Sequence, residues 1–126
     1  MKWFDYAAPA SIGEAIGLLT SHPGARLLAG GTDLLVQLRA GRKETDLVVD
    51  VKRIPELNTL QYDPKAGLTL GAAVPCYRIY GDATVSRHYP AFAEVASLMV
   101  ARRFRDALQS AAICAMRRQA RIPCRC

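Results

Sequence analysis

The stretch Leu27-Leu28-Ala29-Gly30-Gly31-Thr32-Asp33-Leu34-Leu35 decides the fold of this 126-residue chain. The two leucines that open it predict a short buried strand, and the two glycines predict a turn. The three leucines at positions 34, 35 and 38 repeat with helical spacing up to Gly41, and the valine-rich segment 47–51 predicts a second strand. The order strand, turn, helix, strand predicts a βαβ unit with parallel pairing.

A glycine turn of this kind has a chemical use. Glycines let the backbone approach a ligand closely, and free amides before a helix favour phosphate or pyrophosphate. A tight turn without any ligand fits the same spacing equally well. The turn is neither a P-loop nor a GxGxxG fingerprint. Because the Asp33 carboxylate would repel a phosphate if it pointed inward, we expect Thr32 or Asp33 to cap the helix instead.

The segments on either side predict alternating helix and strand. Ser11 and Glu14 form a capping box, and apolar residues follow it at helical spacing, namely Ala15, Ile16, Leu18 and Leu19. Before this helix we expect an extended segment whose aromatic residues pack in the core, namely Trp3, Phe4 and Tyr6.

A β-hairpin is predicted after a helical turn at residues 54–57. Its arms are residues 58–62 and 68–73, and its loop is 63–67, where Pro64 and Gly67 turn the chain. The small residues 71–73 suit either a close approach to a bulky ligand or an eased strand bend. Helices are expected at 77–82 and 91–100, the second with Phe92 and Met99 in the core.

Charge is concentrated at one end of the chain. The net charge of +6 equals that of residues 101–126 alone, which hold seven arginines against Asp106. A nucleic-acid partner would therefore rest on this segment only. No apolar run could span a bilayer, no signal peptide or metal-ligand spacing is visible, and the two histidines are isolated. The four cysteines without a secretory signal predict reduced thiols and a cytoplasmic location.

Three stretches, in this order, resemble the FAD-binding domain of the molybdenum hydroxylases, the medium subunit of carbon monoxide dehydrogenase and the flavin domain of xanthine dehydrogenase. They are Phe4-Asp5-Tyr6-x-x-Pro9-Ala10-Ser11, Leu27 to Leu34, and Leu70-Gly71-Ala72-Ala73-Val74. The resemblance covers residues 2–100. It implies an α+β, two-lobed FAD-binding fold of the vanillyl-alcohol-oxidase and xanthine-dehydrogenase flavin-domain type, of which this chain holds the N-terminal portion.

The resemblance also implies a function and a site. FAD would take electrons from a partner's iron–sulfur clusters and pass them to an acceptor, beside a molybdenum-cofactor large subunit and an iron–sulfur small subunit. One set of residues would hold the pyrophosphate, namely Leu28, Ala29, Gly30, Gly31, Thr32, Asp33 and Leu34. A second set would lie near the flavin, namely Leu70, Gly71 and Ala72. Two alternatives stay open: a truncated fragment unable to hold FAD and, with weaker support, a basic nucleic-acid-binding module.

The resemblance divides the chain into three parts: a first lobe at 1–57, the start of a second at 58–100, and an aberrant tail at 101–126. The family continues with a second loop that reads roughly QIRN-x-ATIGGN and a Cys-Asn-Ala-Ser-Pro-like run, which the tail lacks. A shifted reading frame can supply both missing strings. If each new codon consists of the third base of one residue's codon and the first two bases of the next, residues 108–125 can encode T-I-G-G-N-L-C-N-A-S-P-S-A-D-T-L-P. We therefore expect the tail to be out-of-frame translation, with a genuine basic tail as the alternative.

Overall fold

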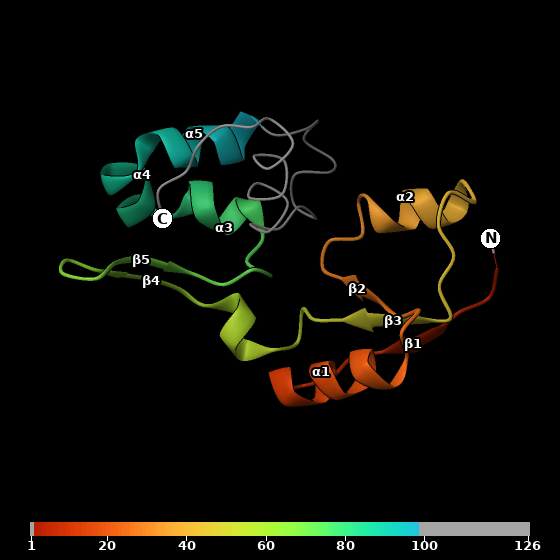
Figure 1. Ribbon diagram of the computed structural model, residues 1–126. Helices are drawn as coiled ribbons and strands as arrows, with labels where there is room; N and C mark the ends of the chain where they lie inside the picture. The colour runs from red at the N-terminus through yellow and green to blue at the C-terminus, as the bar shows by residue number, and fades with distance from the viewer. Residues whose placement is uncertain (1, 99–126) are drawn as a thin grey trace.

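The structure, a computed structural model, describes residues 2–98 of the chain (Figure 1). Its elements in chain order are β1 (Asp5–Ala7), α1 (Ile12–Ser21), β2 (Arg26–Leu28), α2 (Leu34–Arg39), β3 (Leu47–Asp50), the 3-10 helix η1 (Pro55–Asn58), β4 (Leu60–Asp63), β5 (Gly67–Leu70), α3 (Cys76–Gly81), α4 (Ala83–His88) and α5 (Pro90–Leu98). The expected tail and Met99 lie outside the described residues.

A three-stranded parallel sheet organises the first half of these residues. Its order is β1-β3-β2, so β3 lies in the centre and pairs in parallel with both neighbours. The predicted βαβ unit is confirmed, with α2 as the crossover between β2 and β3. Figure 1 shows α1 and α2 on opposite faces of this sheet.

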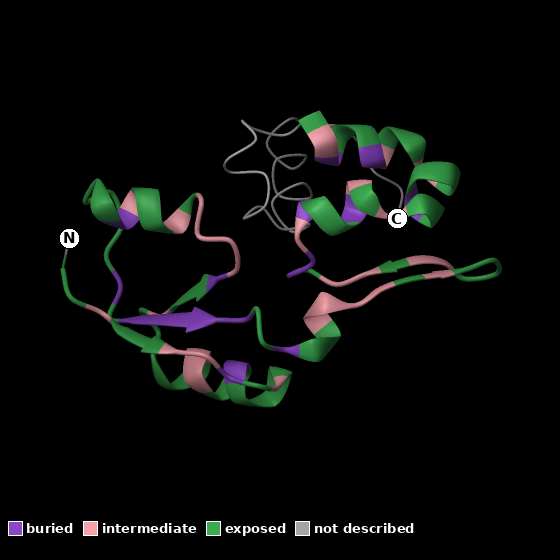
Figure 2. Cartoon of the chain, turned by 180° about the vertical axis from the view of Figure 1, so that it is seen from behind, coloured by how far each residue is buried: buried purple, intermediate pink, exposed green. Residues whose placement is uncertain are grey.

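The central strand forms the core of this half. All four residues of β3 are buried, and Figure 2 shows the strand buried along its whole length. Leu47 and Val49 pack with Ala15 of α1, whereas Val48 packs with Leu28 and Leu38 on the α2 side. The valine-rich run is therefore explained by helices on both faces of a parallel strand.

The capping box at the start of α1 forms with one difference from the expected bonds. The Glu14 amide donates to Ser11 Oγ at 3.2 Å, as predicted. The Glu14 carboxylate, however, accepts from the Ala10 amide at 3.0 Å and not from the Ser11 amide. The Glu14 carboxylate thus binds the amide one residue before the N-cap Ser11.

Several apolar residues that were expected in the core are exposed. Trp3 is fully exposed, and more than half of the surface of Tyr6 and Ile16 is accessible. Phe4 is partly buried and does pack beside the Leu28 cluster. The core expectation was wrong for Trp3, which precedes β1, and for Tyr6, whose hydroxyl donates to Asp50 while its side chain stays exposed.

The second half combines the predicted hairpin with three short helices. β4 and β5 pair antiparallel, and the Asp63 carboxylate accepts hydrogen bonds from two loop amides, those of Lys65 and Ala66. The helix α4, which the sequence reading did not anticipate, begins at Asp82, whose carboxylate caps it. A buried cluster joins α3, α4 and α5, and Phe92 packs against its edge. It contains Val74, Cys76, Ile79, Val85, Ala93 and Ala96.

Two kinds of feature are missing from residues 2–98. None of the helices there has the length and apolar character to cross a membrane. In the same residues no group of three or more histidine, cysteine or acidic side chains could hold a metal ion.

Candidate functional site

The candidate site is the turn between β2 and α2, called here the glycine turn and made of residues 28–34. It emerges at the carboxyl edge of the parallel sheet, where ligands of open α/β sheets bind. Gly31 has a φ of +80°, a conformation that favours glycine. A Cβ added there would lie 2.9 Å from Leu35 Cδ1 and 3.1 Å from Leu28 Cδ1. The turn therefore requires a glycine at position 31 for both backbone and packing reasons.

The backbone amides of the glycine turn are available to a ligand. Within residues 2–98, no oxygen accepts a hydrogen bond from the amides of Gly30, Gly31, Thr32 or Asp33. Successive free amides around a residue with positive φ form a concave site for an anion. This arrangement fits the pyrophosphate of a dinucleotide. The backbone amides can donate hydrogen bonds to it, and Gly30 and Gly31 have no side chains to block its approach.

Asp33 does not cap α2, contrary to the sequence expectation. Its backbone is helical, with φ −101° and ψ −54°, and its side chain accepts no hydrogen bond from a helix amide. Instead both carboxylate oxygens accept from Gln37 Nε2, at 2.7 and 2.6 Å. Because a capping side chain needs an extended backbone, the helical conformation of Asp33 excludes that role. Its bond to Gln37 directs the carboxylate along α2.

A cavity of about 510 Å³ adjoins the glycine turn. It is lined by Gly30, Gly31, Thr32, Leu35, Val36, Arg39 and Ala40. Leu35 is half-exposed here, and Val36 is more exposed still. The cavity thus combines apolar side chains, a guanidinium and free amides, which suits a ligand with both a ring and a phosphate. The spacing of Gly31, Leu35 and Arg39 by one helical turn each was the signal that could have found it.

A buried carboxylate lies at the same edge of the sheet. Asp50, at the end of β3, is only 4% exposed. Its Oδ2 accepts from the Tyr6 hydroxyl at 2.6 Å and pairs with Lys52 Nζ at 3.1 Å, while its Oδ1 accepts from the Lys52 amide at 3.0 Å. Burial raises the pKa of the Asp50 carboxyl, but these hydrogen bonds and the Lys52 charge lower it more, so the pKa lies below its usual value. The sequence reading assigned Asp50 no role.

This lowered pKa predicts a pH-dependent contribution to stability. A depressed carboxyl pKa adds stability above the unfolded-state value and loses it as the pH falls through the folded-state value. We expect Asp50→Asn to lower the free energy of unfolding by roughly 1–2 kcal/mol at pH 7. The difference from the parent chain should shrink below the usual pKa of 3.8. Urea unfolding at pH 7 and pH 3, followed by circular dichroism, measures it; an equal difference at both pH values contradicts it.

The structure places the second predicted set at the end of β5, with Leu70 as its last residue and Gly71 and Ala72 directly after it, beside η1. The Gly71 amide donates to Thr59 O at 2.7 Å, and the Ala73 amide donates to Leu57 O at 2.8 Å. A Cβ added at Gly71 would lie 2.3 Å from Leu57 O. The glycine at position 71 is therefore required by a close approach of this chain to its own backbone. The glycine turn and this second set are packed with different cores, those of Leu28 and Val74 respectively.

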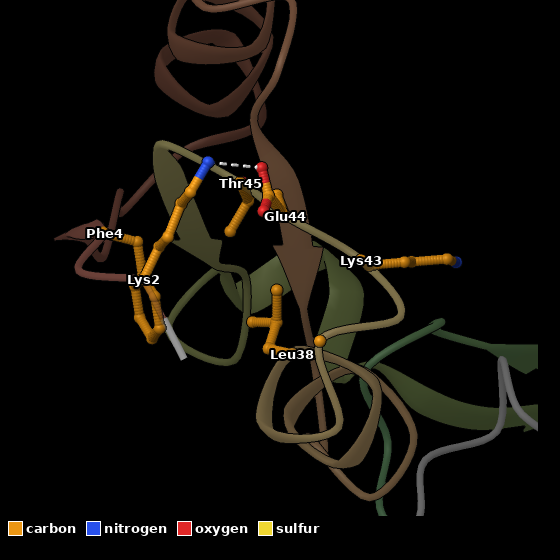
Figure 3. Close-up of a pocket in the computed structure, with 7 residues that line it drawn as sticks. Lys2, Phe4, Leu38, Lys43, Glu44 and Thr45 are labelled. Atoms are coloured by element: carbon orange, nitrogen blue, oxygen red, sulfur yellow. Dashed lines mark hydrogen bonds and ion pairs between the residues drawn. The ribbon is translucent and has the colours of Figure 1, made fainter.

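A further cavity, of about 200 Å³, lies at the opposite, amino edge of the parallel sheet (Figure 3). Its lining includes Phe4 and Leu38, and the ammonium of Lys2 pairs with Glu44 across it at 2.6 Å. This ion pair balances the charge of Lys2, but Lys43 also lines the cavity. The glycine turn is the better candidate for a phosphate-bearing ligand, because its backbone amides have no acceptor within residues 2–98.

Comparisons with known proteins agree with this geometry. Residues 2–120 match the family described as FAD binding domain in molybdopterin dehydrogenase. The chain is 33% identical over 106 residues to the xanthine dehydrogenase FAD-binding subunit of Escherichia coli O157:H7, covering 82% of this chain and 36% of that one. It is also 33% identical over 97 residues to the carbon monoxide dehydrogenase medium chain of Hydrogenophaga pseudoflava, covering 76% and 33%. The chain thus spans about a third of the length of these relatives.

Several solved structures have a fold closely similar to that of this chain. Carbon monoxide dehydrogenase from Hydrogenophaga pseudoflava matches with a TM-score of 0.85 and 30% identity, covering 90% of this chain and 40% of that one. Quinoline 2-oxidoreductase from Pseudomonas putida 86 matches with a TM-score of 0.82 and 32% identity, covering 89% and 40%. These neighbours confirm the fold class that the resemblance implied, and the family description confirms FAD as the family's cofactor. The chain belongs to the FAD-binding domain family of the molybdopterin dehydrogenases.

Proposed function

We propose that this chain binds FAD and that the glycine turn holds its pyrophosphate. The observation that carries the proposal is the set of free backbone amides at residues 30–33, beside a glycine with a positive φ. Seven residues make up this part of the site, the same set that the resemblance implied: Leu28, Ala29, Gly30, Gly31, Thr32, Asp33 and Leu34.

The residues of the chain bind and orient the cofactor, whereas the bound flavin supplies the electron transfer. Amides at Gly30 and Gly31 donate to the pyrophosphate oxygens, and the absence of side chains there permits close approach. The Arg39 guanidinium adds positive charge along the cavity, and Leu35 with Val36 offers apolar surface to a ring. We include Leu70, Gly71 and Ala72, at the end of β5, as the part of the chain near the flavin, on the basis of the family resemblance.

The whole protein's activity is part of the same proposal. We propose an oxidoreductase component that relays electrons from a partner's iron–sulfur clusters through FAD to an acceptor. A molybdenum-cofactor large subunit and an iron–sulfur small subunit are the proposed partners. The proposal is supported by the relatives, which are named as an FAD-binding subunit and a medium chain. A cytoplasmic location also belongs to the proposal, and the buried free thiol of Cys76 fits a reducing compartment.

The decisive experiment is FAD binding by the purified chain. We expect added FAD to stay with the protein through desalting, with a flavin absorbance band and quenched flavin fluorescence. The alternative, a fragment that cannot hold FAD, predicts complete loss of flavin on desalting and would replace the proposal. Nucleic-acid binding, the weaker alternative, depends on the arginines of residues 101–126, which lie outside the described part of the chain.

The origin of residues 101–126 remains a proposal about the gene. We propose that this segment is read out of frame, because a shifted frame can restore a T-I-G-G-N string and the Cys-Asn-Ala-Ser-Pro run. The family match continues through residues 101–120 in the printed reading frame, and this part of the match counts against the proposal. Sequencing the gene tests it: a shifted frame that lacks this string, or that soon meets a stop codon, refutes the idea.

A further inference from the structure

The packing of β3 alone does not explain why a carboxylate is buried at Asp50. The other three residues of β3 are apolar and fully enclosed, and a fourth apolar residue would fill the strand at a lower cost. A buried charge is destabilising unless hydrogen bonds and an opposite charge compensate it. Here three donors do so, from β1 and from the segment after β3. This compensated burial indicates that Asp50 has a role beyond filling space in the core.

The position of Asp50 connects it to the glycine turn. Asp50 is the register partner of Leu28, the last residue of β2 and the first of the turn. In a parallel sheet, register partners direct their side chains to the same face, here the α2 face that also holds Val48. Leu28 in turn borders Gly31, since a Cβ at Gly31 would lie 3.1 Å from Leu28 Cδ1. The carboxylate therefore lies beside the residue from which the turn departs.

A chain of hydrogen bonds runs from the carboxylate to the turn. Asp50 Oδ1 accepts from the Lys52 amide at 3.0 Å, which holds the chain in a tight bend just after β3. Within this bend the Val51 amide donates to Leu28 O at 3.0 Å. This is the last backbone bond to the sheet before the free amides of residues 30–33. The carboxylate thus holds the bend that anchors the first residue of the turn.

We propose that Asp50 is a positioning residue for the pyrophosphate-binding turn, an inference that rests on the proposed function. Tyr6 and Lys52 fix the carboxylate, the carboxylate fixes the bend, and the bend anchors Leu28 so that the free amides keep one arrangement. Asp50 itself does not touch the cofactor. The charged or titratable groups that act on it are Tyr6 from β1 and Lys52 after β3, and Arg53 acts in turn on Tyr6, while β2 contributes the uncharged Leu28.

The test compares Asp50→Ala and Asp50→Asn with a matched control, Asp63→Asn. Asp63 is also a carboxylate that accepts two backbone amides and has a lowered pKa, but it lies in the β4–β5 loop. Affinity for FAD and for inorganic pyrophosphate is measured at pH 7 and at a temperature below the unfolding midpoint of every variant. Hydrogen exchange at the Val51 amide and the chemical shifts of the Gly30 and Gly31 amides are measured by NMR without ligand.

The expected results separate positioning from a general loss of stability. Asp50→Ala should weaken both ligands about tenfold, speed exchange at Val51 and shift both glycine amides. Asp50→Asn, which keeps an acceptor for the Lys52 amide, should have a smaller effect in the same direction. Asp63→Asn should leave all three measurements at the parent values. If Asp50→Ala does not fold, Asp50→Asn and Tyr6→Phe carry the comparison.

Three outcomes would overturn the inference in different ways. If the parent chain binds FAD and the Asp50 variants bind it equally well, Asp50 is only structural and the proposed function stands. If Asp63→Asn weakens binding as much as the Asp50 variants, the effect is general destabilisation and the positioning role is refuted. If the parent chain binds neither FAD nor pyrophosphate, the proposed function fails and the positioning role fails with it.

Discussion

Replacing Gly71 by alanine is expected to lower the free energy of unfolding by roughly 3 kcal/mol, the largest loss we predict. The added Cβ would lie 2.3 Å from Leu57 O and 2.4 Å from Leu57 C, distances that no side-chain rotation can relieve. Relief requires the backbone after β5 to move away from η1. That movement would weaken the hydrogen bonds from Gly71 to Thr59 and from Ala73 to Leu57.

A matched glycine makes the Gly71 result interpretable. A Cβ at Gly17, in the exposed part of α1, meets nothing within 4 Å. Gly17→Ala should therefore raise the free energy of unfolding by about 0.5–1 kcal/mol, through helix propensity. Urea unfolding of both variants, followed by far-ultraviolet circular dichroism, gives the comparison. A Gly71→Ala variant as stable as the parent chain would show that the segment after β5 does not need its contact with η1.

The second large effect is expected on cofactor affinity, from Gly31→Ala. Alanine at a φ of +80° costs about 1–2 kcal/mol, and its Cβ would press on Leu35 and Leu28. Both changes distort the turn whose amides at residues 30–33 are free. We expect affinity for FAD to fall at least about tenfold, since the donors no longer converge on one anion. Titration of flavin fluorescence at a temperature where the variant is folded measures this change.

Gly41 provides the control for this prediction, because it lies just beyond the other end of α2. Its φ is +68°, but a Cβ there meets nothing within 4 Å. Gly41→Ala therefore introduces similar backbone strain on the same helix without touching the glycine turn. It should cost stability and leave the FAD affinity unchanged. Equal losses of affinity in both variants would mean that binding follows overall stability and that the turn is not the pyrophosphate site.

The two glycines also separate two reasons for a small residue near a cofactor. Gly31 is needed by a turn whose amides are free for a ligand, so its substitution should affect binding most. Gly71 is needed by contact with the chain's own backbone at Leu57, so its substitution should affect folding most. The pattern of small residues looked alike in the sequence at both places. Only the atoms around each position distinguish a requirement of the ligand from a requirement of packing.

Local patterns determined much of this protein from its sequence alone. The glycine turn, the helix after it and the valine-rich strand depend on residues that are neighbours along the chain, so their spacing specifies the βαβ unit. The capping residue Ser11 and the turn residues Pro64 and Gly67 act in the same local way. The resemblance of these stretches to the flavin domains could be recognised from the sequence for the same reason, since each motif is short and continuous.

Tertiary structure decided how residues distant in sequence use those elements. The exposure of Leu35 and the approach of Gly71 to Leu57 each depend on which face of an element finds a partner. The burial of Asp50 is the clearest case, because its partner Tyr6 is 44 residues away and belongs to another strand. A sequence pattern records what each element prefers. Which preferences are met depends on packing among elements, and packing alone brought Asp50 beside the turn that we propose holds FAD.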